Sequence, residues 1–207
     1  MTVMDEEKGK LLNYKKLMRN PKYKKHWNTL SANEFGRLAN GVGGRIKKPA
    51  NTIKLIRNKD VPIARRKDVT YGSFVCNVHN NKSENNRTRS VLGGDQINYP
   101  EEAEMPTADM LVAKLLFNSV VSTRNTKFMT MDISNFYLMT PLKRLGYIHI
   151  SVKDIPDKII NEYKLRDKAD KNGSVYIEAN CGMYGLPQAG LLSNKLLEER
   201  LNKRVCQ

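Results

Sequence analysis

The chain has 207 residues and a formal net charge of +15, which favours a polyanionic partner, most simply nucleic acid. A ribosomal-type protein or a merely basic surface is the alternative. No apolar run approaches the ~20 residues of a membrane-spanning helix, the N-terminus lacks the pattern of a secretory signal, and three widely spaced cysteines indicate a reducing compartment.

Residues 1–25 are predicted to form a basic N-terminal helical segment, followed by a second unit over residues 26–207. Leu11, Leu12 and Met18 recur at helical spacing within residues 5–19. Acidic residues come first and basic residues last in this stretch, which suits the helix dipole. The pattern therefore predicts a helix that ends in a basic patch.

Residues 70–78 alternate between two faces as a β-strand does. A polar turn follows over residues 80–86, and residues 87–92 are expected to return as the partner strand. Arg87 and Arg89 are two residues apart, so both project from the same face of that strand. The pattern predicts a β-hairpin that carries a pair of arginines.

Strands and helices continue to alternate after this hairpin. A helix is expected to begin at Pro106 and to reach about Val120, with Leu111 and Leu115 on its apolar stripe. The other expected elements are a strand ending at Asp132, a strand over 147–152, a short helix over 156–165, a strand over 174–178 and a helix over 188–204. Interleaved elements of both kinds predict a mixed α and β fold.

Asp132 follows an apolar run and precedes a short polar turn. An aspartate at the end of a buried strand presents its carboxylate from a rigid base, and magnesium ions prefer such oxygen ligands. The ordinary alternative is an aspartate that caps the turn at Ser134-Asn135. The segment by itself leaves both interpretations open.

Two motifs in order resemble the palm of a reverse transcriptase, in particular that of copia-type retroelements. The first is Asp132 followed by Phe136-Tyr137, and the second is Gly182-Met183-Tyr184-Gly185-Leu186-Pro187-Gln188-Ala189-Gly190. The second is similar to the Leu-Tyr-Gly-Leu-Lys-Gln-Ala of that class. The segment from Trp27 to Glu34 and Arg87-Thr88-Arg89 extend the likeness over residues 26–207. The implied fold is α+β: the fingers and partial palm of a right-hand polymerase, with an antiparallel palm sheet and flanking helices.

This resemblance implies RNA-directed DNA synthesis by two-metal nucleotidyl transfer, with Mg²⁺ or Mn²⁺ as cofactor. Asp132 corresponds to the first palm aspartate, a ligand to both metal ions, and the Ile133 carbonyl completes the metal shell. Tyr137 corresponds to the ring that blocks a ribose 2′-hydroxyl by its volume. Gln188 is expected to contact the sugar or phosphates of the nucleotide. In ordinary alternatives, Tyr137 is a core residue and Gln188 merely begins a helix.

Four further residues acquire roles from the same resemblance. Gly185 and Gly190 are expected to let the backbone approach the template and the nucleotide closely. Arg87 and Arg89 lie on the expected fingers hairpin, where guanidinium groups clasp the triphosphate. Arg89 is the preferred contact, and the alternative is that both arginines are solvated hairpin residues.

One departure from the family limits the prediction. The family has a paired-aspartate hairpin later in the palm, whereas no Asp-Asp pair occurs anywhere in these 207 residues. One carboxylate does not hold two metal ions. The chain is therefore expected to be a fragment that ends before that motif and is inactive alone. The second hypothesis is a non-catalytic nucleic-acid-binding remnant of such an element.

The resemblance also implies partners and a location. The expected partners are an RNA or DNA template–primer, deoxynucleoside triphosphates, and the rest of a polyprotein that supplies the remaining palm, a thumb and an RNase H domain. No membrane is involved. The expected location is intracellular, in a cytoplasmic virus-like particle with access to the nucleus.

Overall fold

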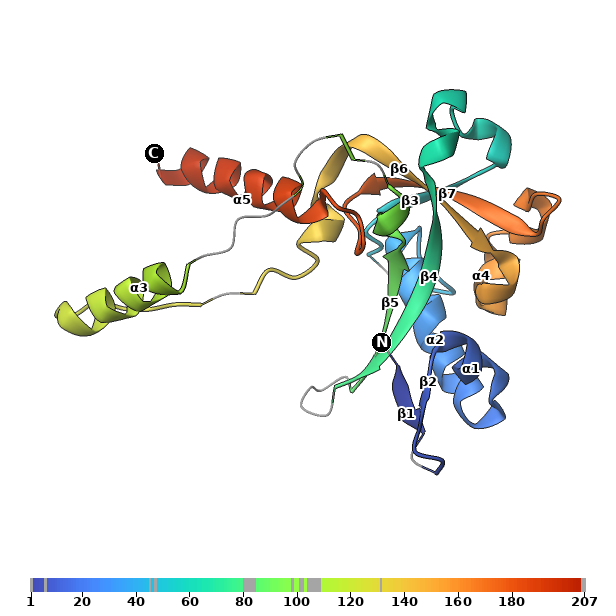
Figure 1. The fold of residues 1–207 in the computed structure, drawn as a ribbon, viewed down its shortest axis with the longest axis horizontal. Coiled ribbons are helices and arrows are strands. Elements are labelled where there is room, and N and C mark those ends of the chain that lie inside the picture. The colour runs from blue at the N-terminus through green and yellow to red at the C-terminus, as the bar shows by residue number, and fades with distance from the viewer. Residues whose placement is uncertain are drawn as a thin grey trace.

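A computed structural model describes residues 2–5, 7–44, 46, 48–79, 85–97, 99–100, 103, 109–130 and 132–205, excluding the side chains of residues 204 and 205. Helices and strands are interleaved around a curled five-stranded sheet (Figure 1). The predicted α+β class is therefore confirmed at this level.

The N-terminus forms a small β-hairpin before its first helix. Strands β1 (Val3–Asp5) and β2 (Lys10–Leu12) pair antiparallel, and helix α1 covers Tyr14–Arg19. The prediction of one helix over residues 5–19 is thus wrong in its first part. Gly9 has φ +59°, a left-handed conformation that turns the chain back on itself.

The boundary expected after residue 25 falls inside helix α2 (Pro21–Leu38). Asn20 caps this helix, because its side chain accepts a hydrogen bond from Lys22 N at 3.1 Å. Val3 and Leu17 from the preceding segment are buried in the main hydrophobic core. The N-terminal residues are therefore packed together with the sheet.

The sheet has the strand order β3-β7-β6-β4-β5. Its strands are β3 (Ile53–Ile56), β4 (Val69–Val78), β5 (Asn86–Leu92), β6 (Pro141–Ser151) and β7 (Ser174–Cys181). The β4–β6 pair is parallel and the other three pairs are antiparallel. The sheet is therefore mixed, and the expectation of a purely antiparallel sheet is wrong. The long connection between β5 and β6 brings β6 back beside β4 in the same direction.

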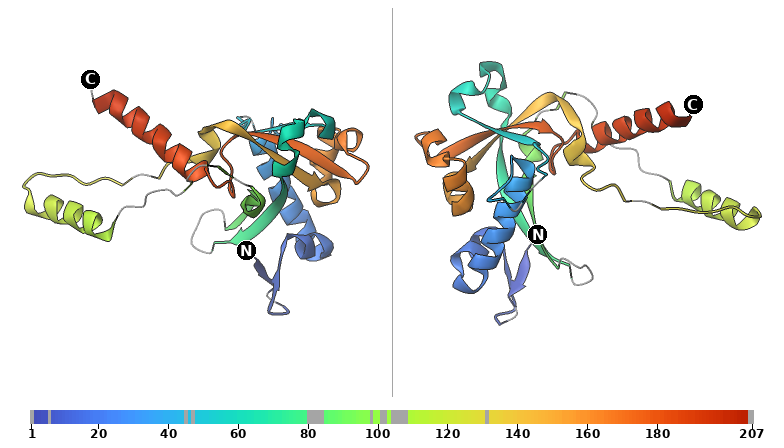
Figure 2. Two further views of the ribbon diagram at one scale, coloured as in Figure 1. Left: turned by 45° about the horizontal axis from the view of Figure 1, so that its top comes forward. Right: turned by 180° about the vertical axis from the view of Figure 1, so that it is seen from behind.

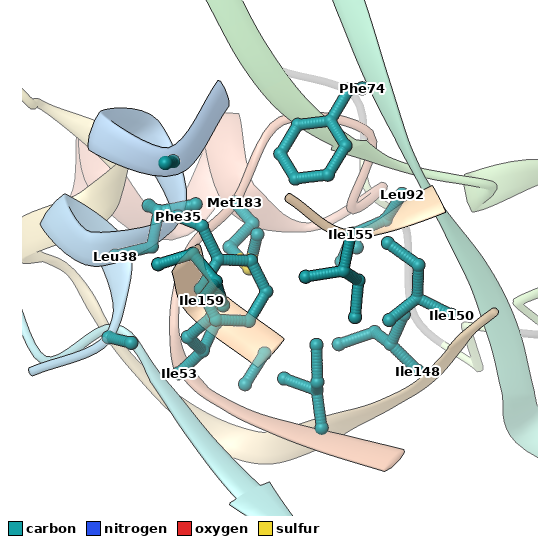
Figure 3. Close-up of a cluster of buried hydrophobic side chains, with 14 of the residues drawn as sticks. Phe35, Leu38, Ile53, Phe74, Leu92, Ile148, Ile150, Ile155, Ile159 and Met183 are labelled. Carbon is teal, nitrogen blue, oxygen red and sulfur yellow. The ribbon is translucent and has the colours of Figure 1, made fainter. Parts of the chain in front are cut away.

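The main core lies between the sheet and helices α1, α2 and α4 (Asp157–Glu162). Figure 3 shows part of it, where Phe35 and Leu38 of α2 and Ile159 of α4 lie in one cluster with sheet residues. Alternate strand residues such as Ile148 and Ile150 face this core, as their period of two predicts. Helix α2 contributes Trp27, Phe35 and Leu38 from one stripe. Each buried side chain of this size contributes about 1.5–3 kcal/mol to folding.

Six 3-10 helices link these elements. They are η1 (Asn58–Asp60), η2 (Ile63–Asp68), η3 (Gly94–Gln96), η4 (Tyr137–Met139), η5 (Val152–Asp154) and η6 (Leu165–Lys168), counted within the described ranges. A second, smaller core of Ile56, Val61 and Tyr147 lies beside η1 and η2.

Helices α3 (Met110–Ser122) and α5 (Ala189–Val205) extend away from the sheet (Figures 1 and 2). Asp109 caps α3 by accepting a hydrogen bond from Leu111 N at 3.0 Å. The expected helix start at Pro106 lies outside the described residues. Every residue of α3 is described and none is buried, so the predicted stripe of Leu111 and Leu115 faces no core.

Within the described ranges, the chain contains no helix with the length and apolar character needed to cross a membrane.

Candidate functional site

The two hairpin arginines lie on one face of the β4–β5 ribbon, as predicted. The antiparallel register places Arg89 opposite Val75 and Arg87 opposite Asn77. These four residues and His79 line a small hollow on that face. Cys76 lies on the other face, where burial raises the pKa of its thiol to about 11. The hairpin thus separates a basic face from an apolar one.

The loop after β7 joins directly to the end of this hairpin. Leu92 N donates a hydrogen bond to the Tyr184 carbonyl at 2.9 Å. Gly185 has φ +96°, and a Cβ there would lie 2.1 Å from the Leu92 oxygen. Any side chain at Gly185 would therefore push the loop off β5. Gly185 was expected to let the backbone approach the template or nucleotide. In the structure it lets the loop approach the backbone of β5.

Tyr137 reaches the same loop from a third part of the chain. It begins η4, is half-buried, and its ring centroid lies 5.8 Å from that of Tyr184 at an interplanar angle of 81°. From β5, the Arg89 guanidinium carbon lies 4.8 Å from the same Tyr184 ring centroid. Tyr184 belongs to the second motif, and the sequence predicted no role for it. The structure brings Arg89, Tyr184, Gly185 and Tyr137 together.

Gln188 lies inside the protein. Its side chain is only 3% exposed, and Oε1 has no hydrogen-bond partner among the described residues. Its backbone carbonyl accepts a hydrogen bond from Leu192 N at 3.0 Å, which begins α5. Gly190 lies in the first turn of that helix and is half-buried. A contact between Gln188 and a nucleotide would need this buried amide to become accessible.

The strand expected to end at Asp132 does not form. Residues 125–130 are irregular, Phe128 and Met129 are 43% and 74% exposed, and Met131 lies outside the described residues. A strand needs neighbours for its backbone groups, and no strand of the described sheet pairs with these residues. Asp132 and Ile133 are consequently exposed rather than held at the end of a buried strand.

The turn after Asp132 is nevertheless attached to the fold. Asn135 has φ +57°, and its side-chain oxygen accepts a hydrogen bond from Arg37 Nη1 on α2. Arg37 also forms an ion pair with the buried Glu34 at 2.7 Å. The polar turn expected after Asp132 is therefore present and is tied to α2 through Asn135.

The described residues do not build a two-metal centre. No group of three or more histidine, cysteine, aspartate or glutamate side chains is arranged among them to hold a metal ion. Asp132 would be one carboxylate ligand, and Ile133 would add only a carbonyl oxygen. This donor set does not fit two divalent cations, which require several carboxylate oxygens.

A polar groove between α2 and the edge strand β5 was missed by sequence reasoning. It has a volume of about 720 Å³ and is lined by His26, Leu30, Asn33, Glu34, Arg37, Ile46, Asn85, Asn86, Arg87 and Thr88. Asn33 Oδ1 is buried and has no hydrogen-bond partner among the described residues. The available signals were the segment from Trp27 to Glu34 and the hairpin residues Arg87-Thr88, because both contribute residues to the lining of this groove.

Comparisons with models of known protein families, with curated proteins and with solved structures find no match.

Proposed function

We propose that this chain is the fingers and first half of the palm of a copia-type reverse transcriptase, an RNA-directed DNA polymerase. The observation that supports this proposal is the meeting of Arg89, Gly185 and Tyr137 around Tyr184. The resemblance had assigned nucleotide-related roles to the first three. They come from β5, the loop after β7 and η4, so no local sequence pattern requires them to meet.

The chemistry of this meeting point suits a deoxynucleoside triphosphate. Guanidinium groups bind phosphate oxygens through paired, charge-assisted hydrogen bonds. Arg87 lies two residues from Arg89 on the same face and adds a second positive charge. A tyrosine ring beside the sugar discriminates by volume against a 2′-hydroxyl. We assign triphosphate binding to Arg89 with Arg87, and the sugar gate to Tyr137.

Catalysis would need more than these residues. We propose that Asp132 and the Ile133 carbonyl join metal ligands that lie outside these 207 residues, since the chain has no Asp-Asp pair. The proposed partners are a template–primer, deoxynucleoside triphosphates and the rest of a polyprotein, and the proposed location is a virus-like particle. Gln188 and Gly190, at the start of α5, would take their roles only in that completed assembly.

A non-catalytic nucleic-acid binder is the second candidate. It is favoured by the groove beside Arg87, whose lining includes amide side chains, Arg37 and two aliphatic residues and needs no metal ion to bind a ligand. The exposed, unsupported Asp132 is also consistent with this function. Both candidates place nucleic acid on the basic side of the hairpin, so binding alone does not separate them.

The deciding experiment supplies the missing palm and thumb from an intact related element, fused after Gln207. We expect the fusion to extend a primer with Mg²⁺ and deoxynucleotides, and Asp132→Ala to abolish extension. Tyr137→Ala should keep deoxynucleotide incorporation and admit ribonucleotides, because only the volume beside the 2′-hydroxyl changes. An active Asp132→Ala protein would refute the polymerase assignment. An inactive but folded fusion that still binds duplex would support the second candidate.

A further inference from the structure

Tyr184 is the one side chain that contacts both the hairpin arginine and the proposed sugar gate within the described residues. Its ring centroid lies 4.8 Å from the Arg89 guanidinium carbon and 5.8 Å from the ring centroid of Tyr137. Tyr137 in turn lies 5.8 Å from the Phe136 ring. The contacts form a continuous series from β5 to η4.

The backbone around Tyr184 holds its ring in a defined place. Its carbonyl accepts the 2.9 Å hydrogen bond from Leu92 N, and the next residue, Gly185, meets the Leu92 backbone. Gly94 approaches the same loop, since a Cβ there would lie 1.9 Å from the Gly185 oxygen. The tyrosine is therefore fixed relative to β5 by main-chain contacts on both sides.

Arg89 has hydrogen-bonding capacity that the described residues do not use. Its Nε is buried and has no hydrogen-bond partner among them. A buried unpaired donor costs free energy, and a guanidinium stacked on an aromatic ring keeps its N–H edge available for an oxyanion. Arg87, Asn77 and His79 line the hollow beside it. The site is thus a cluster of donors beside a basic hollow of about 10 Å³, so a polyphosphate would lie at the mouth of the hollow rather than inside it.

We infer that Tyr184 is a positioning residue that holds Arg89 for the polyphosphate of a deoxynucleoside triphosphate and couples it to Tyr137. The inference rests on the proposed function, because the ligand class comes from there. Stacking on Tyr184 restricts the long arginine side chain, so less conformational entropy is lost when phosphate binds. The contact with Tyr137 keeps the sugar gate in register with the phosphate-binding arginine.

The test uses the full 207-residue chain and three probes: dATP, tripolyphosphate and deoxyadenosine. Affinities are measured by NMR titration for the wild type and for Tyr184→Phe, Tyr184→Leu, Arg89→Gln and the Arg89→Gln/Tyr184→Leu double variant. We expect dATP and tripolyphosphate to bind and deoxyadenosine not to bind. Tyr184→Phe keeps the ring and should stay within about twofold, whereas Tyr184→Leu and Arg89→Gln should each weaken binding about five- to tenfold. The double variant should bind no more weakly than Arg89→Gln.

A second measurement follows the Arg89 Nε–H signal without ligand. Hydrogen exchange at this group should be slow in the wild type and in Tyr184→Phe, and faster in Tyr184→Leu. Circular dichroism confirms that each variant is folded. This readout reports on the stacking contact itself.

The possible results distinguish the positioning role of Tyr184 from the proposed nucleotide site itself. If Tyr184→Leu binds dATP like the wild type while Arg89→Gln loses binding, the positioning role is wrong and the proposed nucleotide site stands. If Tyr184→Phe is as weak as Tyr184→Leu, the hydroxyl rather than the stacked ring is responsible, and the inference is wrong. If the wild type binds neither dATP nor tripolyphosphate, the proposed nucleotide site fails and the inference fails with it.

Discussion

At the scale of single residues, charge pairs in partly buried positions join separate elements. Asp68, at the end of η2, accepts hydrogen bonds from Arg65 Nε at 2.9 Å and from Arg144 Nη2 of β6 at 2.6 Å. Burial opposes ionisation of this carboxyl, but the hydrogen bonds from Arg144 and Arg65 outweigh it and lower the pKa of Asp68. The carboxylate therefore ties η2 to the sheet.

We expect Asp68→Asn to lower the free energy of unfolding at pH 7 by about 1–3 kcal/mol, because it removes a charged acceptor from two arginines. The folded-state pKa is lowered, so this stabilisation is present above the ordinary value of about 3.9 and is lost as the pH falls through the folded-state value. Urea unfolding at pH 7 and near pH 2 measures the difference. The exposed Asp167→Asn is the control, and a difference that stays constant with pH would contradict the assignment.

At the scale of elements, the edge strand β5 is covered by contacts from two other segments. Ser90 N donates to Glu34 Oε1 of α2 at 3.3 Å, and Leu92 N donates to the Tyr184 carbonyl at 2.9 Å. Exposed edge strands invite pairing with other chains. The same contacts that build the candidate site therefore also protect this edge of the sheet.

Gly185→Ala should destabilise the protein more than Gly173→Ala. Both glycines have positive φ, at +96° and +72°, so both substitutions introduce backbone strain of about 1–2 kcal/mol. Only at Gly185 would the new Cβ collide with backbone, whereas Gly173 faces open space. The collision adds about 1–3 kcal/mol. Urea midpoints of the two variants provide the comparison, and equal losses would show that the loop moves away from β5 freely.

Truncating an apolar side chain to alanine should lower the free energy of unfolding much more on α4 than on α3. Ile159→Ala removes a fully buried side chain and should cost about 2–5 kcal/mol. Leu115→Ala, on the exposed α3, should change the free energy of unfolding by less than about 0.5 kcal/mol. Thermal and urea unfolding measure both values. A large loss in Leu115→Ala would mean that α3 is packed against other parts of the protein in solution.

At the scale of the whole molecule, the charge of +15 is the dominant property. Phosphate contacts release counterions from nucleic acid, so affinity should fall steeply as salt rises. The hairpin arginines, the groove beside α2 and the candidate site lie on connected parts of the fold. A nucleic-acid strand that follows this surface would reach all three.

We expect the chain to bind a primer–template duplex with a strong dependence on salt and to add no nucleotide to the primer, since the described residues offer no two-metal centre. Replacing Arg87 and Arg89 by glutamine should reduce the slope of log affinity against log salt by about one for each arginine. Lys59→Gln, far along the chain from the hairpin, is the control. Fluorescence anisotropy from low to high salt and a primer-extension assay give the two readouts. An affinity that does not change with salt would contradict the proposed nucleic-acid-binding surface. Primer extension would contradict the prediction that this chain alone is inactive.

The sequence alone determined the features that depend on local periodicity. Alternation placed Ile148 and Ile150 of β6 toward the core and Arg87 and Arg89 on one face of β5, because side chains in a strand alternate whatever its partner is. Helices α4 and α5 were likewise expected near their observed places. In each case the pattern of apolar residues reports which side of an element is buried.

Only the tertiary structure decided which distant segments meet. The parallel β4–β6 pair depends on where the chain returns after α3. The backbone before Asp132 is irregular because no strand of the described sheet pairs with it, and an apolar run by itself carries no record of its neighbours. Tyr184 gained a role because the Leu92 hydrogen bond and Gly185 bring its ring to Arg89 and Tyr137. Such contacts form between residues far apart in the chain, and no local period encodes them.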